Sequence, residues 1–272
     1  MSKEFKPFKF PLMLIRKSTS LAECIFLVRD VGEFWRELSD VRPLSTSMIS
    51  IPQDPSLTLI QMFVLKHELP KIVEKIKSMK GIVDAKTSCT KLMERGLALD
   101  SFFFPIVIGD DDVRILCIVE PYMLQAFIDL KNILGSAVDA FLYHLGYHYG
   151  KSIALNAKRL LEIEGKKLSE EMLTMIIDFF ISSARILGWA LIEIEDIDLK
   201  SVKATLRMHD SWESRTYQKL YGKSETPTCY LTKGVIAGVV SEVLGVKVIA
   251  DEVKCQARGD PYCLIKVKKY GY

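Results

Sequence analysis

The residues best suited to chemistry lie near the carboxyl end of the chain, where three cysteines and one glutamate recur within a short stretch. The last two cysteines flank a turn that contains Gly259, so a β-hairpin would bring both sulfurs to one end of a sheet. The glutamate lies just upstream on the same expected strand. The first cysteine begins an expected helix, whose free N–H groups and dipole favour a thiolate. These four candidates are Cys229, Glu252, Cys255 and Cys263.

Three thiolates and one carboxylate form a donor set that suits a tetrahedral, borderline-soft cation, and zinc is the first candidate. Because four protein ligands leave no open coordination position, such a site would stabilise the fold rather than catalyse a reaction. The same residues also fit a second interpretation, three buried reduced thiols beside a surface glutamate, since the chain contains no Cys-x-x-Cys pair.

Two histidine patterns are weaker signals. His144 and His148 are four residues apart and share one face of an expected helix, which could clamp a metal or offer an imidazole to haem iron. No carboxylate or third histidine accompanies them, so we interpret both as structural. His209 stands beside Asp210, but no partner nucleophile is visible, and we interpret this pair as lying on the surface at a strand end.

A third set of residues could line a small-molecule cavity. Aromatic and methionine side chains recur in the second half of the chain at spacings that would place them in an apolar interior. The same spacings fit an ordinary core, so the pattern leaves both interpretations open. The candidate ligand-binding residues are Tyr143, Tyr147, Phe179, Phe180, Trp189, Met208 and Trp212.

Composition limits the class of protein. The chain has 272 residues, of which 49% are hydrophobic and 26% charged, and this balance is typical of globular proteins with two domains. The formal net charge of +3 is too small to indicate a nucleic-acid binder, and we expect no direct contact with nucleic acid. No apolar run reaches about 18 residues without a charge, so we expect no membrane-spanning helix and no exported leader. We therefore predict a cytoplasmic protein whose six cysteines are reduced or bound to metal.

Periodicity organises the first part of the chain. Residues 1–19 form a basic arm, which we interpret as a solvated terminus. Residues 20–92 follow with the order β-α-β-β-α-β, in which two prolines, Pro52 and Pro55, turn the chain between the second and third strands. This order is the split βαβ arrangement, and it resembles the ferredoxin-like fold of the ACT family of regulatory domains. An amino-acid effector site at residues 29–33 and a plain dimerisation or linker domain both remain open.

Residues 93–122 form a connecting segment with an expected hairpin around the acidic turn at 109–112, which we interpret as solvated. The second domain, 123–272, is expected to begin with helices over about 123–163 and 169–187. Strands over 190–197 and 199–208 follow, then a mobile, polar segment around 213–227 and a helix from about 228 to 244. Gly234 and Gly238, one turn apart on that helix, would allow another backbone to approach closely.

The text of this second domain resembles a known family. The matching residues are Leu-Gly-Tyr-His-Tyr-Gly at 145–150, Leu-Gly-Trp at 187–189, Cys229, Gly234, Gly238, and the ending Glu252-x-x-Cys255-x-x-x-Gly259-Asp260-x-x-Cys263. Over residues of roughly 97–270 they resemble the 4-vinyl reductase domain. That domain is related to the sensory domains of phenol-responsive bacterial activators and, more distantly, to transport-particle subunits and haem nitric-oxide sensors. In its zinc-bearing branch Cys, Glu, Cys and Cys hold the metal at similar spacings. The resemblance therefore implies zinc on the four candidates and a compact domain that forms a homodimer.

We therefore expect an α+β chain, with an N-terminal ferredoxin-like (ACT-like) domain and a mixed α/β domain that ends in a zinc-bearing hairpin. The leading hypothesis is a regulatory protein that binds a small, largely apolar or aromatic molecule and signals through a partner protein or its own N-terminal domain. One alternative is a reductase or accessory factor acting on a tetrapyrrole or aromatic substrate, although the chain has no GxGxxG dinucleotide motif and no identifiable catalytic residue. The other is a non-catalytic adaptor similar to transport-particle subunits.

Overall fold

The computed structural model describes residues 13–17, 19–51, 54–102, 107–108, 113–166 and 168–271. It divides into two compact units, Met1–Leu116 (unit 1) and Cys117–Tyr272 (unit 2). Most of the basic arm and the acidic turn at 109–112 lie outside the described residues. Among the described helices, none combines the length and the apolar character needed to cross a bilayer.

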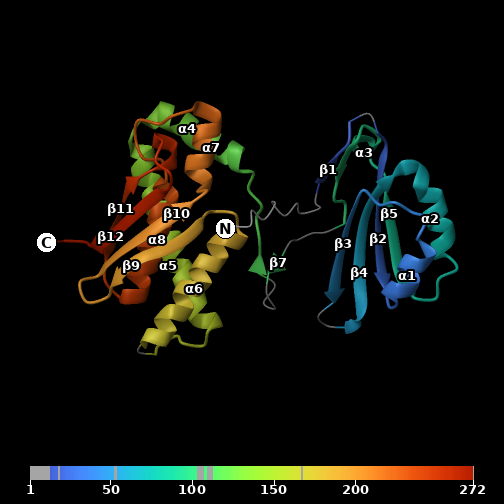
Figure 1. Ribbon diagram of the computed structural model, residues 1–272, viewed down its shortest axis with the longest axis horizontal. Helices are drawn as coiled ribbons and strands as arrows, with labels where there is room; N and C mark the ends of the chain where they lie inside the picture. The colour runs from blue at the N-terminus through green and yellow to red at the C-terminus, as the bar shows by residue number, and fades with distance from the viewer. Residues whose placement is uncertain are drawn as a thin grey trace. The chain divides into compact units, whose positions relative to one another are not determined.

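Unit 1 is built on a four-stranded antiparallel sheet with the strand order β3-β4-β2-β5. Helices α1 and α2 connect the strands in the predicted β-α-β-β-α-β sequence (Figure 1). Both pack on one face of the sheet, because Phe34 from α1 and Ile72 from α2 belong to the same buried cluster as Phe26. The elements are β2 (Leu21–Val28), α1 (Val31–Glu37), β3 (Ser45–Ile51), β4 (Asp54–Leu65), η1 (Lys66–Glu68), α2 (Leu69–Ile76) and β5 (Ile82–Ser88).

The opposite face of this sheet carries a small cover that the sequence analysis missed. Strand β1 (Met13–Ile15), which was expected to be part of a solvated arm, pairs with β6 (Leu97–Leu99). Between β5 and β6 lies the short helix α3 (Lys91–Glu94), whose N-cap hydroxyl on Thr90 accepts the Met93 N–H. The last predicted strand therefore ends at Ser88 and does not extend to residue 92. In the connecting segment only two-residue strands form among the described residues, β7 (Val107–Ile108) and β8 (Val113–Arg114).

Unit 2 joins a second four-stranded antiparallel sheet, in the order β11-β12-β10-β9, to five helices in its described residues (Figure 1). The long helix expected over 123–163 is broken, because Gly135 adopts a positive φ of 64° and ends α4. The elements are α4 (Glu120–Leu134), α5 (Ala137–Leu160), α6 (Glu170–Ile186), β9 (Leu191–Asp198), β10 (Lys203–His209), α7 (Trp212–Tyr221), α8 (Tyr230–Leu244), β11 (Val248–Lys254), η2 (Gln256–Arg258) and β12 (Cys263–Lys269).

Helices α5 and α8 are packed backbone against backbone, as the glycine spacing predicted. A Cβ atom added at Gly238 would lie 1.9 Å from the carbonyl oxygen of Tyr147, and one added at Gly146 would lie 2.2 Å from that of Leu231. Gly150 and Gly234 are equally crowded by the facing helix. No residue other than glycine fits these four positions without moving a helix, so the contact fixes where α8 begins and where the cluster described next is assembled.

Candidate metal and ligand sites

The four predicted metal ligands come together in unit 2. One sulfur from each of Cys229, Cys255 and Cys263 and one carboxylate oxygen of Glu252 all lie within 4.8 Å of one another, and all four residues are buried. Cys229 is the N-cap of α8, and Glu252 lies in β11. The remaining two cysteines bracket the η2 turn between β11 and β12. The hairpin and the helix start thus deliver ligands that are far apart in the sequence to one point.

The turn that carries Cys255 and Cys263 is fixed by local chemistry. Gly259 adopts a left-handed φ of 97°, which a residue with a Cβ rarely adopts, and this lets the chain reverse. The carboxylate of Asp260 accepts the Cys255 N–H at 2.8 Å. On the facing side, Glu252 Oε2 accepts the Cys229 N–H at 2.8 Å, which ties β11 to the start of α8. The backbone is therefore held in place by hydrogen bonds as well as by the sulfur cluster.

Two buried serines contact the sulfurs, and the sequence analysis did not identify them. Ser214 Oγ lies 3.2 Å from Cys229 Sγ and 3.0 Å from Cys263 Sγ, and Ser211 Oγ lies 3.2 Å from Cys229 Sγ. Ser214 belongs to a region that was expected to be mobile and polar, and that expectation was wrong. Residues 212–221 form helix α7, and Ser214 is fully buried. Apolar residues at helical spacing, Trp212, Tyr217 and Leu220, were the available signal.

The cluster is electrostatically unusual without a cation. Burial raises the pKa of Cys229 well above its usual range and raises that of Glu252 to about 8. Hydrogen bonds from the other two thiols hold the pKa of Cys255 well below its usual range. One carboxylate oxygen, Glu252 Oε1, is buried and has no hydrogen-bond partner among the described residues. Closely spaced sulfurs together with an unpaired carboxylate oxygen suit a soft divalent cation that neutralises them together.

A second buried glutamate, Glu213 on α7, supports the same helix start. Its side chain is 1% exposed, and its carboxylate accepts the N–H of Leu231 at 3.0 Å and both the N–H and the hydroxyl of Thr232 at 2.9 and 2.6 Å. These are the first-turn N–H groups of α8 that have no partner within the helix. Burial raises the pKa of Glu213 to about 7 despite these donors. Glu213 and Glu252 thus cap α8 from two different elements.

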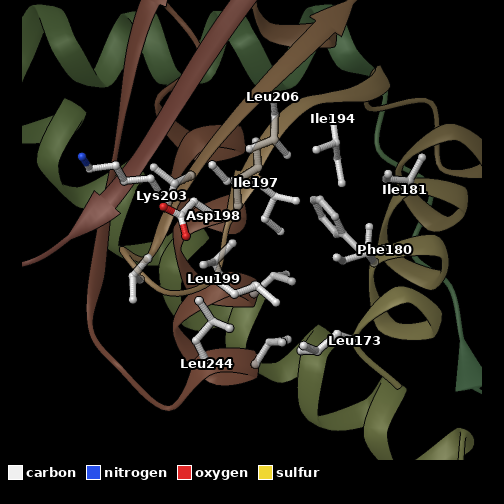
Figure 2. Close-up of a pocket in the computed structure, with 18 residues that line it drawn as sticks. Leu173, Phe180, Ile181, Ile194, Ile197, Asp198, Leu199, Lys203, Leu206 and Leu244 are labelled. Carbon is white, nitrogen blue, oxygen red and sulfur yellow. The ribbon is translucent and has the colours of Figure 1, made fainter. Parts of the chain in front are cut away.

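An apolar pocket of about 60 Å³ lies between α6, α8 and the sheet, and we call it the α6 pocket. Figure 2 shows Leu173, Phe180 and Ile181 of α6 facing Ile194 and Leu206 of the sheet across it. Apart from Asp198 and Lys203, every side chain that lines this pocket is aliphatic or aromatic. The arrangement can hold an apolar group and offers a carboxylate and an ammonium to a polar substituent.

The structure does not gather the seven predicted ligand-binding residues around one cavity. Phe180 lines the α6 pocket, whereas Met208 is fully buried in β10 and Tyr147 packs against the same core. The others are held elsewhere: Tyr143, whose hydroxyl accepts the Ala250 N–H at 3.2 Å; Phe179, in a cluster with Ile176; Trp189, stacked on Tyr149 at 5.7 Å; and Trp212, 6.2 Å from the Phe127 ring. The remaining lining of the α6 pocket comes mostly from aliphatic side chains, which carry no distinctive sequence signal.

The histidines take the structural places expected of them. His144 and His148 are exposed and pack edge-on against Tyr143 and Tyr147, with ring centroids 5.7 and 5.5 Å apart. Within the described residues neither joins a group of three potential metal ligands. The carboxylate of Asp210 accepts a hydrogen bond from Arg215 at 2.6 Å.

Comparisons with known proteins agree with this architecture. An uncharacterized protein of Methanocaldococcus jannaschii is 29% identical over 167 residues, which cover 59% of this chain and 60% of that protein. The phenol regulator MopR of Acinetobacter guillouiae is 31% identical over 82 residues, 29% of this chain and 15% of the regulator. This chain thus spans less than two thirds of the length of either relative.

Among solved structures, the phenol-responsive sensory domain of the transcription activator PoxR, crystallised with phenol, aligns with a TM-score of 0.51 at 20% identity. The alignment covers 58% of this chain and 78% of that domain, and it shows a shared fold. Residues 208–269, which include Ser211, Glu213, Ser214 and all four clustered ligands, match the vinyl-4-reductase domain family. The resemblance to the 4-vinyl reductase domain is thus confirmed for this part of the chain, which carries a domain of that family.

Proposed function

We propose that this chain is a regulatory protein whose unit 2 binds a small aromatic or apolar molecule in the α6 pocket. The observation that carries the proposal is the nearly all-apolar wall of that pocket. The fold shared with a phenol-responsive sensory domain and the sequence similarity to a phenol regulator support a ligand of this class. The protein acts in the cytoplasm, where its six free cysteines would stay reduced. The bound state is read out by a partner protein or by unit 1.

The size of the α6 pocket predicts how a ligand enters. An empty volume of 60 Å³ costs about 1.4 kcal/mol at about 24 cal/mol per Å³, and an occupant recovers this free energy. A cavity of about 150 Å³ is enough for one benzene ring. Phenol must therefore displace side chains of α6, among them Leu173 and Phe180, and its hydroxyl would face Asp198 or Lys203 (Figure 2). Ligand binding would in this way shift α6.

The test is a phenol titration of the full chain by isothermal calorimetry, repeated with Ala204→Leu. Ala204 lines the pocket and is buried, so the added methyl groups fill it. We expect saturable phenol binding to the wild type and none to the variant, whose unfolding free energy rises by up to about 1 kcal/mol. Ala126→Leu, on an exposed position of α4, is the matched control and should bind phenol normally. Equal phenol affinity in all three proteins would exclude this pocket.

We also propose that Cys229, Glu252, Cys255 and Cys263 hold zinc. The mutual distances within 4.8 Å, the complete burial and the unpaired Glu252 Oε1 support this assignment. When bound, zinc supplies positive charge and a cross-link between α8 and the β11–β12 hairpin. The chain's own residues orient the sulfurs, with Ser211 and Ser214 as hydrogen-bond donors and the Gln256 N–H donating to Cys263 Sγ at 3.3 Å.

A homodimer is proposed from the surface of α5. Phe141, Leu145 and Tyr149 follow one another at intervals of four residues and are 59%, 47% and 47% exposed, so they form an apolar stripe on one side of the helix. Such a stripe is what a two-fold copy would bury. Phe141→Glu should convert a dimer to a monomer in sedimentation-velocity runs, while Ile186→Glu, which adds the same charge at an 80% exposed position, should not. A monomeric wild type at tens of micromolar would refute the dimer.

For unit 1 we infer an ACT-like, ferredoxin-like module. The strand order β3-β4-β2-β5, with α1 and α2 on one face, supports this assignment. Such a module can connect ligand binding in unit 2 to a partner.

A further inference from the structure

Unit 2 contains a second pocket that none of these proposals uses. It has a volume of about 260 Å³ and is lined by α4, α5, α7 and the segment from Ser224 to Tyr230, and we call it the α4–α7 pocket. Helices α4 and α7 lie side by side in Figure 1 and are in contact. The volume exceeds the roughly 150 Å³ that is enough for one benzene ring. The pocket can therefore take an aromatic ring with a short substituent as it stands.

The wall of this pocket is apolar in one part and charged in another. Leu124 and Phe127 of α4 and Leu142 of α5 give hydrocarbon surface. Charged groups come from Lys131 of α4, Asp139 of α5 and Glu213 of α7. A purely apolar molecule would leave these charges without a partner, so the wall fits a ligand that has an apolar body and one polar end.

The charges on the wall do not balance. The ammonium of Lys131 is already paired with Asp139, with its Nζ 2.8 and 2.7 Å from the two carboxylate oxygens. Glu213 is 1% exposed, and the three hydrogen bonds that it accepts come from the neutral groups of Leu231 and Thr232. One ammonium against two carboxylates leaves an excess of one negative charge. A cationic ligand would be attracted there, and an anionic one repelled.

Aromatic rings in the same wall favour a cation as well. The ring of Tyr230 lines the pocket and already has two ammonium groups near its face, Lys131 Nζ at 5.2 Å and Lys233 Nζ at 4.4 Å from the centroid. Phe127 and Tyr217 add two further rings. The faces of such rings carry partial negative charge and attract ammonium groups within about 6 Å. Carboxylates and aromatic rings thus point to the same chemistry.

We propose that the α4–α7 pocket binds a small primary amine with an aromatic or aliphatic body. The protonated amine lies toward the carboxylates of Glu213 and Asp139 and the tyrosine rings, and the body packs on Leu124, Phe127 and Leu142. No covalent step is involved. Because Glu213 also holds the first turn of α8, an occupant of this pocket contacts the same α7 carboxylate that helps to position Cys229.

The first test compares three probes of equal size in calorimetric titrations of the full chain at pH 8. We expect phenethylamine to bind at least about tenfold more tightly than 2-phenylethanol, its uncharged counterpart, and phenylacetate to show no binding. Equal affinity for the amine and the alcohol, or no binding of the amine, would overturn the proposal.

The second test changes the charge of the wall in both directions. Lys131→Met raises the excess negative charge and should tighten phenethylamine about tenfold, whereas Asp139→Asn removes it and should weaken the amine by a similar factor. Shifts of both variants in one direction would overturn the proposal, since damage to the fold cannot tighten binding. Ala204→Leu, which fills the α6 pocket, should leave the amine affinity within about twofold of wild type. That result separates this site from the proposed phenol site.

Discussion

Replacing Cys255 with serine should remove the bound metal and most of the stability of unit 2. We expect the wild type, purified without chelator, to contain close to one zinc ion per chain by plasma mass spectrometry, and Cys255→Ser to contain almost none. The unfolding free energy should fall by about 4 kcal/mol or more, because the cation cross-links α8 to the hairpin and neutralises buried sulfurs and a carboxylate.

The control for this experiment is Cys117→Ser. Cys117 is exposed and lies outside the cluster, so its loss should change neither metal content nor melting temperature. Glu252→Gln keeps the shape of the side chain and removes its charge, and it should retain less metal than wild type in a chelator competition. A wild type that is free of metal and melts at the same temperature with and without added zinc would remove the metal from this account.

A second large effect should appear when stability is followed against pH. Burial raises the pKa of Glu213 to about 7 in the folded protein, from an ordinary value of 4.5. The folded state therefore holds this proton more tightly than the unfolded state does. The contribution to stability is fully present below pH 4.5 and is lost as the pH rises through about 7, with a total of about 3 kcal/mol. Above that pH the contribution of Glu213 is flat.

Urea unfolding at pH 5, 6, 7 and 8 measures this contribution when Glu213→Gln is compared with wild type. The wild type should lose more stability than the variant between pH 5 and 7, and the comparison cancels the parallel contributions of Glu23 and Glu252, whose pKa values burial also raises. Glu225→Gln, at an exposed position in the loop after α7, should follow the wild-type curve. If the Glu213→Gln and wild-type curves run parallel, Glu213 does not titrate in this range.

Part of this architecture could be predicted because it depends on local patterns. Alternating apolar residues located β3 at its observed bounds, Ser45–Ile51, and the Gly259 turn predicted the hairpin that brings Cys255 and Cys263 together. The positions of Gly234 and Gly238, one helical turn apart, predicted a close backbone contact, although not its partner, α5. In each case the information lies within a few residues of the element itself.

Other features depend on contacts that a linear pattern does not contain. Helix α7 was expected to be a mobile segment because Glu213, Ser214 and Thr216 look solvated, yet all three are buried. Two of these side chains find partners that are distant in the sequence: Ser214 contacts the sulfurs of Cys229 and Cys263, and Glu213 accepts N–H groups of α8. Both pockets are likewise defined by gaps between elements, so single residue types do not reveal them.

The glycine contact between α5 and α8 limits how this protein can respond to a ligand. With carbonyl oxygens occupying the space where side chains would be, neither helix can rotate or slide past the other without colliding. The pair behaves as a rigid axle, and the glutamates that cap α8 hold one end of it. Motion driven by an occupant must therefore pass through the helices that flank this axle, α6 on one pocket and α4 with α7 on the other, which gives the domain two separate levers on one fixed support.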